Sequence, residues 1–213
     1  MTSTFIKFNQ LYQAVQALKS DKLGDFAILK ADAFKAKVDP NVESKLQQVI
    51  GYYPPIDLDK LIQYPKGSFG REYAAHMKEK QLKPFNVSPE LDDVARRNVF
   101  ALRYAVTHDI FHVLLGFDTS YAGEIGVLAF AAEQNYSPTL KFSLNLAKIV
   151  YPILAPFQRK AIFANVRKGR ELGKQAKFLL GVRFEEYWER PLSEVKAELG
   201  LKTEPIRLST RAV

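Results

Sequence analysis

The chain has 213 residues, of which 47% are hydrophobic and 25% are charged. This balance is typical of a soluble chain that buries a core, and the length fits a single domain, which we place at residues 1–213. The absence of cysteine excludes disulfides, thiolate metal sites and a cysteine nucleophile.

The net charge of +8 is concentrated in one segment. Residues 148–183 carry nine basic side chains and one acid, and the rest of the chain carries 22 of each sign. Such a field attracts nucleic acid, anionic lipid head groups or an anionic substrate. We expect no nucleic-acid partner, because the aromatic residues here are spaced for a core face rather than for stacking on bases. These are Phe157, Phe163, Phe178 and Phe184.

The chain contains no apolar run that approaches the roughly 20 residues needed to cross a bilayer. Runs such as residues 125–132 and 149–157 are much shorter. Residues 1–18 lack the basic start, apolar block and cleavage site of a signal peptide. We therefore expect a cytoplasmic protein that is not secreted and has no transmembrane helix, with contact to a membrane surface left open.

The spacing of apolar residues between proline and glycine breaks is mostly helical, so we predict an all-α fold. Ser88 as a cap and Pro89 at the first helical position predict a helix that runs to a stop at Gly116. A second helix is expected from about Ser120 to Gln134. The further helices expected are one from Pro138, interrupted at Pro152 and Pro156, one from about Phe157, and a short one from Pro191 to Gly200.

A histidine pair lies within the first of these helices. His108, Asp109 and His112 are spaced three and four residues apart, so their side chains can converge beside the helix. Two imidazoles and a carboxylate suit a divalent metal, zinc first, then iron or manganese. Glu124 is the best candidate for a fourth ligand, because the turn-rich residues 116–123 can reverse the chain and lay a second helix alongside.

The residues alone leave the chemistry of this site open. The motif also fits solvated helix residues without a metal. A zinc hydrolase would use metal-bound water, with Asp109 in place of the usual glutamate. A metal-dependent phosphohydrolase would recruit His76 as an additional histidine, although we expect His76 to be an exposed helix residue. The chain lacks a Walker-type phosphate loop and a Gly-x-Ser-x-Gly elbow.

The motif also carries a family resemblance. His108-Asp109-x-x-His112 followed after eleven residues by Glu124 is similar to the signature of the fourth coenzyme Q (ubiquinone) biosynthesis protein family. Flanking residues agree, and the similarity runs from about residue 47 to residue 201. They are Arg103-Tyr104, Leu115-Gly116, Pro65 to Gly70, Gly169-Arg170, Phe184-Glu185 and Trp188. The loop 117–122, residues 135–138 and the first forty or so residues depart from the family pattern.

The resemblance implies a compact helical domain with a metal-binding helix pair and an apolar lipid-binding groove. It implies a role in prenylated-quinone (ubiquinone) biosynthesis, with a polyprenyl quinone precursor and a divalent metal bound. One expectation is a metal-dependent oxidative decarboxylase that replaces the C1 carboxyl of a polyprenyl hydroxybenzoate-type ring, with His108 and Asp109 acting through the metal site. The alternative is a non-catalytic lipid-binding scaffold that organises the quinone-biosynthesis enzymes at a membrane.

The resemblance also implies partners and a location. All four motif residues, His108, Asp109, His112 and Glu124, are expected to bind the metal. We expect Arg103, Arg170 and Lys174 to contact the lipid head group. The expected partners are a polyprenyl lipid or quinone precursor, a membrane surface and other quinone-biosynthesis proteins, and a homodimer is left open. The expected location is peripheral to the inner face of a membrane.

Overall fold

A computed structural model describes residues 22–33, 38 and 40–201 of the chain. Residues 1–18, for which the sequence predicts no signal peptide, lie outside these described residues. Over the described residues the chain forms helices and turns, with a single isolated β-bridge between Ser68 and Pro191 and no β-strand, which confirms the all-α prediction. In the same part, no helix combines the length and the apolar character needed to span a membrane.

The α-helices are α2 (Leu23–Ala33), α3 (Pro40–Leu46), α4 (Leu58–Leu61), α5 (Phe69–Glu79), α6 (Asp92–Arg97), α7 (Val99–Leu115), α8 (Tyr121–Glu133), α9 (Pro138–Leu154), α10 (Arg159–Gln175) and α11 (Leu192–Glu198). Short 3-10 turns are η1 (Gln47–Val49), η2 (Pro89–Leu91), η3 (Pro156–Gln158), η4 (Leu179–Gly181) and η5 (Phe184–Tyr187).

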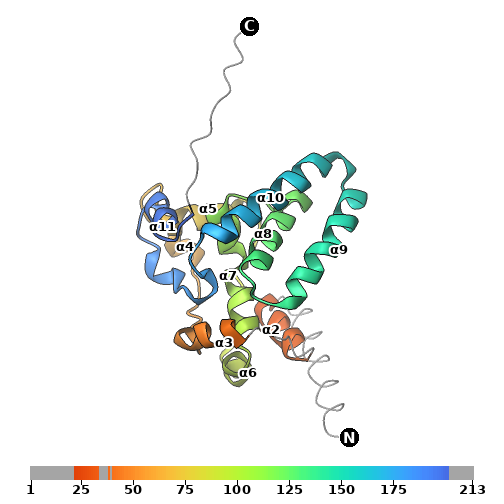
Figure 1. Ribbon diagram of the computed structural model, residues 1–213. Coiled ribbons are helices and arrows are strands. Elements are labelled where there is room, and N and C mark those ends of the chain that lie inside the picture. Colours follow the sequence, from red (N-terminus) through yellow and green to blue (C-terminus); the bar gives the residue numbers. More distant parts are fainter. Residues whose placement is uncertain (1–21, 34–37, 39, 202–213) are drawn as a thin grey trace, which may run out of the picture.

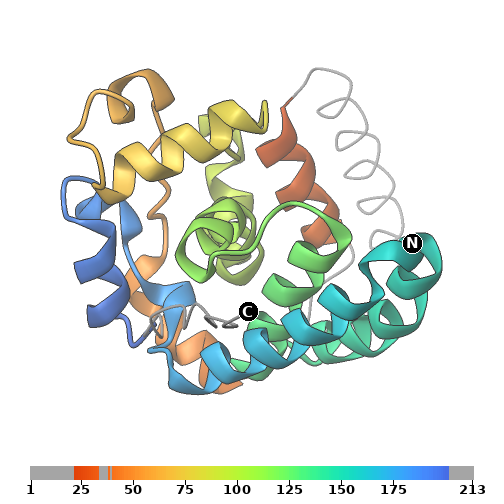
Figure 2. The same ribbon diagram turned by 90° about the horizontal axis from the view of Figure 1, so that it is seen from above.

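Helix α7, which carries the histidine pair, is the central helix of the fold. Figure 1 shows it running through the middle of the molecule, and Figure 2 shows it end-on with other helices around it. Its apolar side chains point in all directions, and a helix that is hydrophobic all round must be buried. Phe100, Ile110 and Phe111 are buried in one core cluster, and Leu102 is buried in another. The histidine motif therefore lies on a helix that is enclosed by both clusters.

The helix predicted from Pro89 to Gly116 is broken near its start. α6 ends at Arg97, and α7 begins one residue after the break, at Val99. Asn98 leaves the helical conformation (φ −124°, ψ 58°), and its side-chain oxygen accepts a hydrogen bond from the backbone N–H of Ala101 at 3.3 Å. An asparagine side chain that caps a new helix in this way competes with continuation of the old one.

Ser88 does not cap the helix that follows it, contrary to the prediction. Its hydroxyl and backbone N–H instead donate to the buried carboxylate of Asp25 on α2, at 2.6 and 2.7 Å. This long-range pair ties α2 to the start of η2. The side chain of Ser88 is directed toward Asp25, and its oxygen accepts no hydrogen bond from the N–H groups of η2.

The connection between α7 and α8 follows the sequence prediction closely. Gly116 ends α7 in the left-handed conformation (φ 67°, ψ 42°), which glycine adopts without a steric cost. Ser120 caps α8 by accepting a hydrogen bond from the N–H of Gly123 at 3.2 Å. The reversal places Glu124, in the first turn of α8, opposite the last turns of α7.

Helix α8 is held against α10 by close backbone contact. A Cβ atom built on Gly169 would lie 2.2 Å from the carbonyl oxygen of Gly126, and one on Gly173 would lie 2.8 Å from Cβ of Glu133. Only glycine allows this approach. α8 is therefore fixed between α7 and α10, which restricts the position of Glu124.

Pro152 does not interrupt α9 as the sequence suggested, because the helix continues to Leu154. The proline lies in the last turn, where its missing N–H removes only one helical hydrogen bond. The cap after Leu154 is Ala155, which precedes Pro156 and leaves the helical conformation (φ −132°, ψ 68°).

Two distant motifs of the family pattern lie side by side. The backbone N–H groups of Phe69 and Gly70 donate to the carbonyls of Arg190 and Trp188, each at 2.8 Å. Ser68 caps α5 by accepting from the N–H of Arg71. The start of α5 is thus hydrogen-bonded to the backbone of residues 188–190.

Candidate metal centre

Three of the predicted ligands converge between α7 and α8. One ligand atom from each of His108, His112 and Glu124 lies within 4.8 Å of the other two. Oε1 of Glu124 is 3.3 Å from Nε2 of His112, and Oε2 is 3.6 Å from Nε2 of His108. This is the convergence that the helical spacing and the reversal at residues 116–123 predicted.

The His112 ring is prepared for a ligand at Nε2. Its side chain is 0% exposed, and its Nδ1 lies 3.2 Å from the carbonyl oxygen of Phe117. A carbonyl only accepts, so Nδ1 carries the proton in this contact and Nε2 keeps its lone pair. Nε2 is buried without a hydrogen-bond partner, since its contact with Glu124 lacks hydrogen-bond geometry. An orphaned imidazole nitrogen facing a second imidazole and a carboxylate fits a bound divalent cation.

The carboxylate of Glu124 also determines the protonation of the site. Burial lowers the pKa of His112, but Glu124 and the Phe117 carbonyl raise it by more, so the net direction is upward. The site therefore favours positive charge at His112. A divalent cation would supply that charge without a proton.

Asp109 lies beside the three converging groups rather than among them. It is 9% exposed, and its Oδ1 is 3.5 Å from Nδ1 of His108, the ring nitrogen opposite the one that faces Glu124. Burial first, and then the charge of Asp109, raises the pKa of Tyr73 on α5. The same charge opposes the lowering of the His76 pKa by burial and by His112 without reversing it. The carboxylate is placed to orient the His108 ring, as carboxylates beside metal-binding histidines commonly do.

His76 is a neighbour of the site that the sequence interpretation placed at the surface. It is half-buried on α5, and its ring stacks on the His112 ring with centroids 6.2 Å apart and planes 15° apart. Its Nε2 is buried without a hydrogen-bond partner. Burial and then the proximity of His112 lower its pKa. No local signal distinguishes this histidine, because its contact depends on how α5 packs on α7.

Arg103 has a structural role in place of the head-group role expected for it. Its side chain is 0% exposed, and its guanidinium donates to the carbonyl oxygens of Tyr52, Leu180 and Val182 at 3.1, 3.4 and 2.6 Å. Glu185 lies 3.9 Å away. Burial dominates both partners, lowering the pKa of Arg103 and raising that of Glu185. A buried guanidinium bound to three carbonyls is not available to a lipid.

Arg170 and Lys174 are exposed on α10, but they lie away from the converging ligands. Arg170 pairs with Glu133 at 2.9 Å and, with Lys141 and Lys148, lines a cavity of about 350 Å³ between α8, α9 and α10. Glu133 is nine residues beyond Glu124 on α8, which corresponds to about 13 Å along the helix. The basic cavity is therefore separate from the candidate metal centre.

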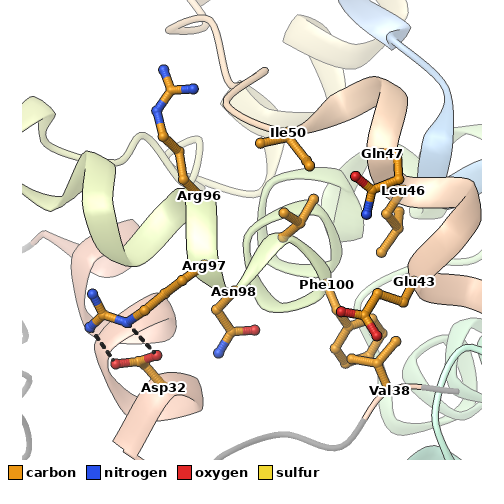
Figure 3. A pocket seen from close by; sticks show the side chains of 11 residues that line it. Asp32, Val38, Glu43, Leu46, Gln47, Ile50, Arg96, Arg97, Asn98 and Phe100 are labelled. Carbon is orange, nitrogen blue, oxygen red and sulfur yellow. Dashed lines mark hydrogen bonds and ion pairs between the residues drawn. The ribbon is translucent and has the colours of Figure 1, made fainter. Parts of the chain in front are cut away.

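A second cavity, of about 400 Å³, opens at the start of α7 (Figure 3). Its wall mixes apolar side chains such as Ile50 and Phe100 with charged ones, including the ion pair of Asp32 and Arg97. This mixed lining differs from the apolar groove that the resemblance implied. Ring contacts lead from Phe100 through Tyr104 to His108, with centroids 5.9 and 6.2 Å apart.

The aromatic residues assigned to a core face divide between core and surface. Phe184 is buried and Phe178 is half-buried, whereas Phe163 is 46% exposed and Phe157 is fully exposed. The prediction is therefore wrong for Phe157 and Phe163. Periodicity indicates that residues share a face but does not say whether that face is covered.

The fold and the site together define a class, an all-helical protein with a His-His-Glu candidate metal centre between two antiparallel helices. The family model described as "Coenzyme Q (ubiquinone) biosynthesis protein Coq4" matches residues 52–205. The chain therefore belongs to the Coq4 family.

Individual relatives agree with this assignment. The "Ubiquinone biosynthesis protein COQ4 homolog, mitochondrial" of Bos taurus is 33% identical over 155 residues, which cover 72% of this chain and 57% of the relative. The COQ4 protein of Eremothecium gossypii is 28% identical over 156 residues, covering 71% and 47%. The chain thus spans about half the length of the curated relatives it matches. A solved structure from Nostoc punctiforme, provisionally named a ubiquinone biosynthesis protein, has a TM-score of 0.63 at 25% identity and covers 94% of this chain and 97% of its own.

Proposed function

We propose that this protein acts in ubiquinone biosynthesis by binding a polyprenyl-substituted aromatic acid next to a divalent metal. The observation that carries the proposal is the convergence of His108, His112 and Glu124, with Nε2 of His112 buried and unpartnered. Two imidazoles and a carboxylate suit zinc, and they also accept manganese or iron. Membership of the Coq4 family supplies the pathway.

Each residue of the centre has a separate task in this proposal. Glu124 supplies the negative charge, and the Phe117 carbonyl holds the tautomer of His112. Asp109 acts through Nδ1 of His108, either holding the ring in place or becoming a fourth ligand when the metal enters. A bound divalent cation would hold the ring carboxylate of the substrate and polarise it.

The reaction that fits this arrangement replaces the C1 carboxyl of the precursor ring by a hydroxyl. The carbon–carbon bond to the carboxyl breaks and carbon dioxide leaves. One oxygen atom of dioxygen becomes the hydroxyl, and the other leaves as water with two electrons and two protons from an external reductant. Catalysis of this conversion is the activity to be tested.

The experiment combines metal analysis with turnover. The full chain and its His108→Ala variant are measured for metal per chain, and for conversion of a prenylated 4-hydroxybenzoate under ¹⁸O-labelled dioxygen. The wild type should bind one metal and form a labelled phenol, and His108→Ala should do neither. Glu133→Gln, on the same helix as Glu124 but outside the site, is the matched control. Turnover retained after loss of the metal would refute the proposal.

A second candidate function is a lipid-binding scaffold that brings other quinone-biosynthesis proteins together at a membrane. The observation that favours it is the large exposed apolar surface of α9, with Phe142, Ile149 and Ile153 between 65% and 72% exposed. In this function Arg170 and Lys174 would contact the lipid head group, and the metal would be structural. A prenyl lipid should then co-purify, and His108→Ala should abolish no chemical step.

A further inference from the structure

Helix α9 is apolar on two opposite faces. Its inner face, with Leu144, Ala147 and Tyr151, packs against α8 and α10. Its outer face carries apolar residues spaced four, three and four apart, which places them on one stripe of a helix. These are Phe142, Leu146, Ile149 and Ile153, which are 69%, 52%, 65% and 72% exposed. Leu154 and the fully exposed Phe157 extend the stripe into η3.

We propose that this outer face of α9, together with η3 and the first turns of α10, docks onto the surface of an anionic bilayer. This surface, defined by Phe142, Leu146, Ile149, Ile153, Leu154, Phe157 and the neighbouring cations, is called the α9 face below. An exposed apolar stripe of this size on a chain that is otherwise well packed indicates an interaction surface. Figure 1 shows α9 at the outer edge of the molecule, where a flat partner can reach it.

The charge around the α9 face selects the partner. The chain has no acidic residue between Glu133 and Glu171, and the interval contains seven cations. They are Lys141, Lys148, Arg159, Lys160, Arg167, Lys168 and Arg170. Arg170 pairs with Glu133, and Lys168 lies over the Phe117 ring, which leaves five of these cations for the α9 face. An apolar face flanked by lysine and arginine is typical of helices that lie in the interface of an anionic membrane.

Three of these cations form a shallow depression beside the stripe. Arg159, Lys160 and Arg167 line about 530 Å³ of space together with Phe163. No carboxylate pairs with them in the part of the chain that the structure describes. The size and charge of this depression suit phosphate head groups. A second copy of the chain is disfavoured, because it would bring two such basic surfaces together.

Hydrogen bonds and a ring contact connect the α9 face to the first turn of α8, which carries Glu124. The backbone N–H of Ala122, two residues before Glu124, donates to Oε1 of Gln158 in η3 at 3.0 Å, and the Ala122 carbonyl accepts from Asn165 of α10 at 2.8 Å. The rings of Tyr121 and Tyr151 are 5.0 Å apart. Docking at this surface therefore places a membrane next to the helix end that presents Glu124.

The role of this docking in presenting a substrate rests on the proposed function. The aromatic head of a precursor could reach the ligands while its polyprenyl chain stays in the bilayer. The docking itself, however, can be measured without metal or turnover.

The test is vesicle flotation of the full chain. Vesicles of phosphatidylcholine alone are compared with vesicles that also contain phosphatidylglycerol, at low and high salt. We expect binding to the anionic vesicles, weakened by salt. The double variant Ile149→Ser/Ile153→Ser should bind at least tenfold more weakly, because two large apolar side chains are lost from the interface. Arg159→Glu/Arg167→Glu should lose at least tenfold on anionic vesicles, from about fivefold per cation removed.

Matched controls separate docking from general effects. Ile50→Ser removes an apolar side chain that is 40% exposed elsewhere on the molecule, and Lys60→Glu reverses an exposed charge on α4. Both should bind vesicles like the wild type. All variants should keep the wild-type unfolding temperature and metal content, since the altered side chains are exposed.

Several results would overturn the proposal. Absence of vesicle binding by the wild type would do so, as would equal binding by the α9-face variants and the controls. A homodimer lost in Ile149→Ser/Ile153→Ser would assign the face to a second copy instead. Failure of docking with metal binding intact would leave the metal-centre proposal standing. Loss of metal in Glu124→Gln with vesicle binding intact would show that docking does not depend on the metal centre.

Discussion

Substitution of Glu124 by glutamine tests the metal centre with the smallest change in shape. The amide keeps the size of the side chain but removes the negative charge that lies 3.3 Å from His112 and 3.6 Å from His108. Loss of a residue that only supports a ligand commonly costs 10- to 100-fold in metal affinity. Loss of one of three converging ligands should cost about 100-fold or more, equivalent to roughly 2.7 kcal/mol. Competition with a chromophoric chelator measures this directly.

The same substitution should change how the stability of the metal-free protein depends on pH. The folded-state pKa of His112 lies above its ordinary value of about 6.5, so this group stabilises the fold fully below about pH 6.5 and loses that contribution as pH rises through the folded pKa. Without the Glu124 charge, the pKa of His112 falls because the largest contributions that raise it are lost, and the stabilisation at acid pH decreases with it. Each unit of lost shift is worth about 1.4 kcal/mol.

Urea unfolding of the chelator-treated protein at pH 5.5 and pH 8 provides the assay. The loss of stability in Glu124→Gln should be larger at pH 5.5 than at pH 8. Glu133→Gln, whose carboxylate pairs with Arg170, should show no such difference. Unchanged metal affinity in Glu124→Gln, or a stability loss that is larger at pH 8, would refute the reasoning.

Asp109→Ala should lower metal affinity 10- to 100-fold in the same chelator assay, because the carboxylate no longer orients the neighbouring histidine, and wild-type affinity would contradict this. Arg103→Met should cost about 3–5 kcal/mol in urea unfolding, since it leaves buried carbonyls and a carboxylate without their cation. Arg170→Met, at an exposed ion pair, should cost about 1 kcal/mol or less, and equal losses would argue against the buried role. Gly169→Ala should cost about 1–3 kcal/mol, because its Cβ would meet an α8 carbonyl at 2.2 Å, whereas Ala164→Ser on the exposed side of α10 should stay within about 0.5 kcal/mol. A stable Gly169→Ala protein would show that the two helices can separate freely.

Local chemistry accounts for the parts of the site that sequence reasoning predicted correctly. The left-handed stop at Gly116 and the cap at Ser120 depend only on residues a few positions away. The four-residue spacing of His108 and His112 is likewise a property of any α-helix. Since all these signals are local, the convergence with Glu124 could be read from the sequence, as could the all-α class.

The residues whose roles or positions were predicted wrongly all make contacts with distant parts of the chain. Ser88 binds Asp25 across 63 positions, Arg103 binds carbonyls 51 to 79 positions away, and His76 contacts the site only because α5 packs on α7. Sequence patterns carry no distance information at such separations.

The sequence by itself determined the all-α class, the turn that pairs α7 with α8 and the types of ligand presented there, because backbone preferences and helical spacing act over one or two turns. Tertiary structure alone decided which faces are covered. The stripe on α9 and the inner face of the same helix have the same apolar period, yet only one of them packs against α8 and α10. Burial is a property of what lies opposite a residue, and no local pattern contains that information.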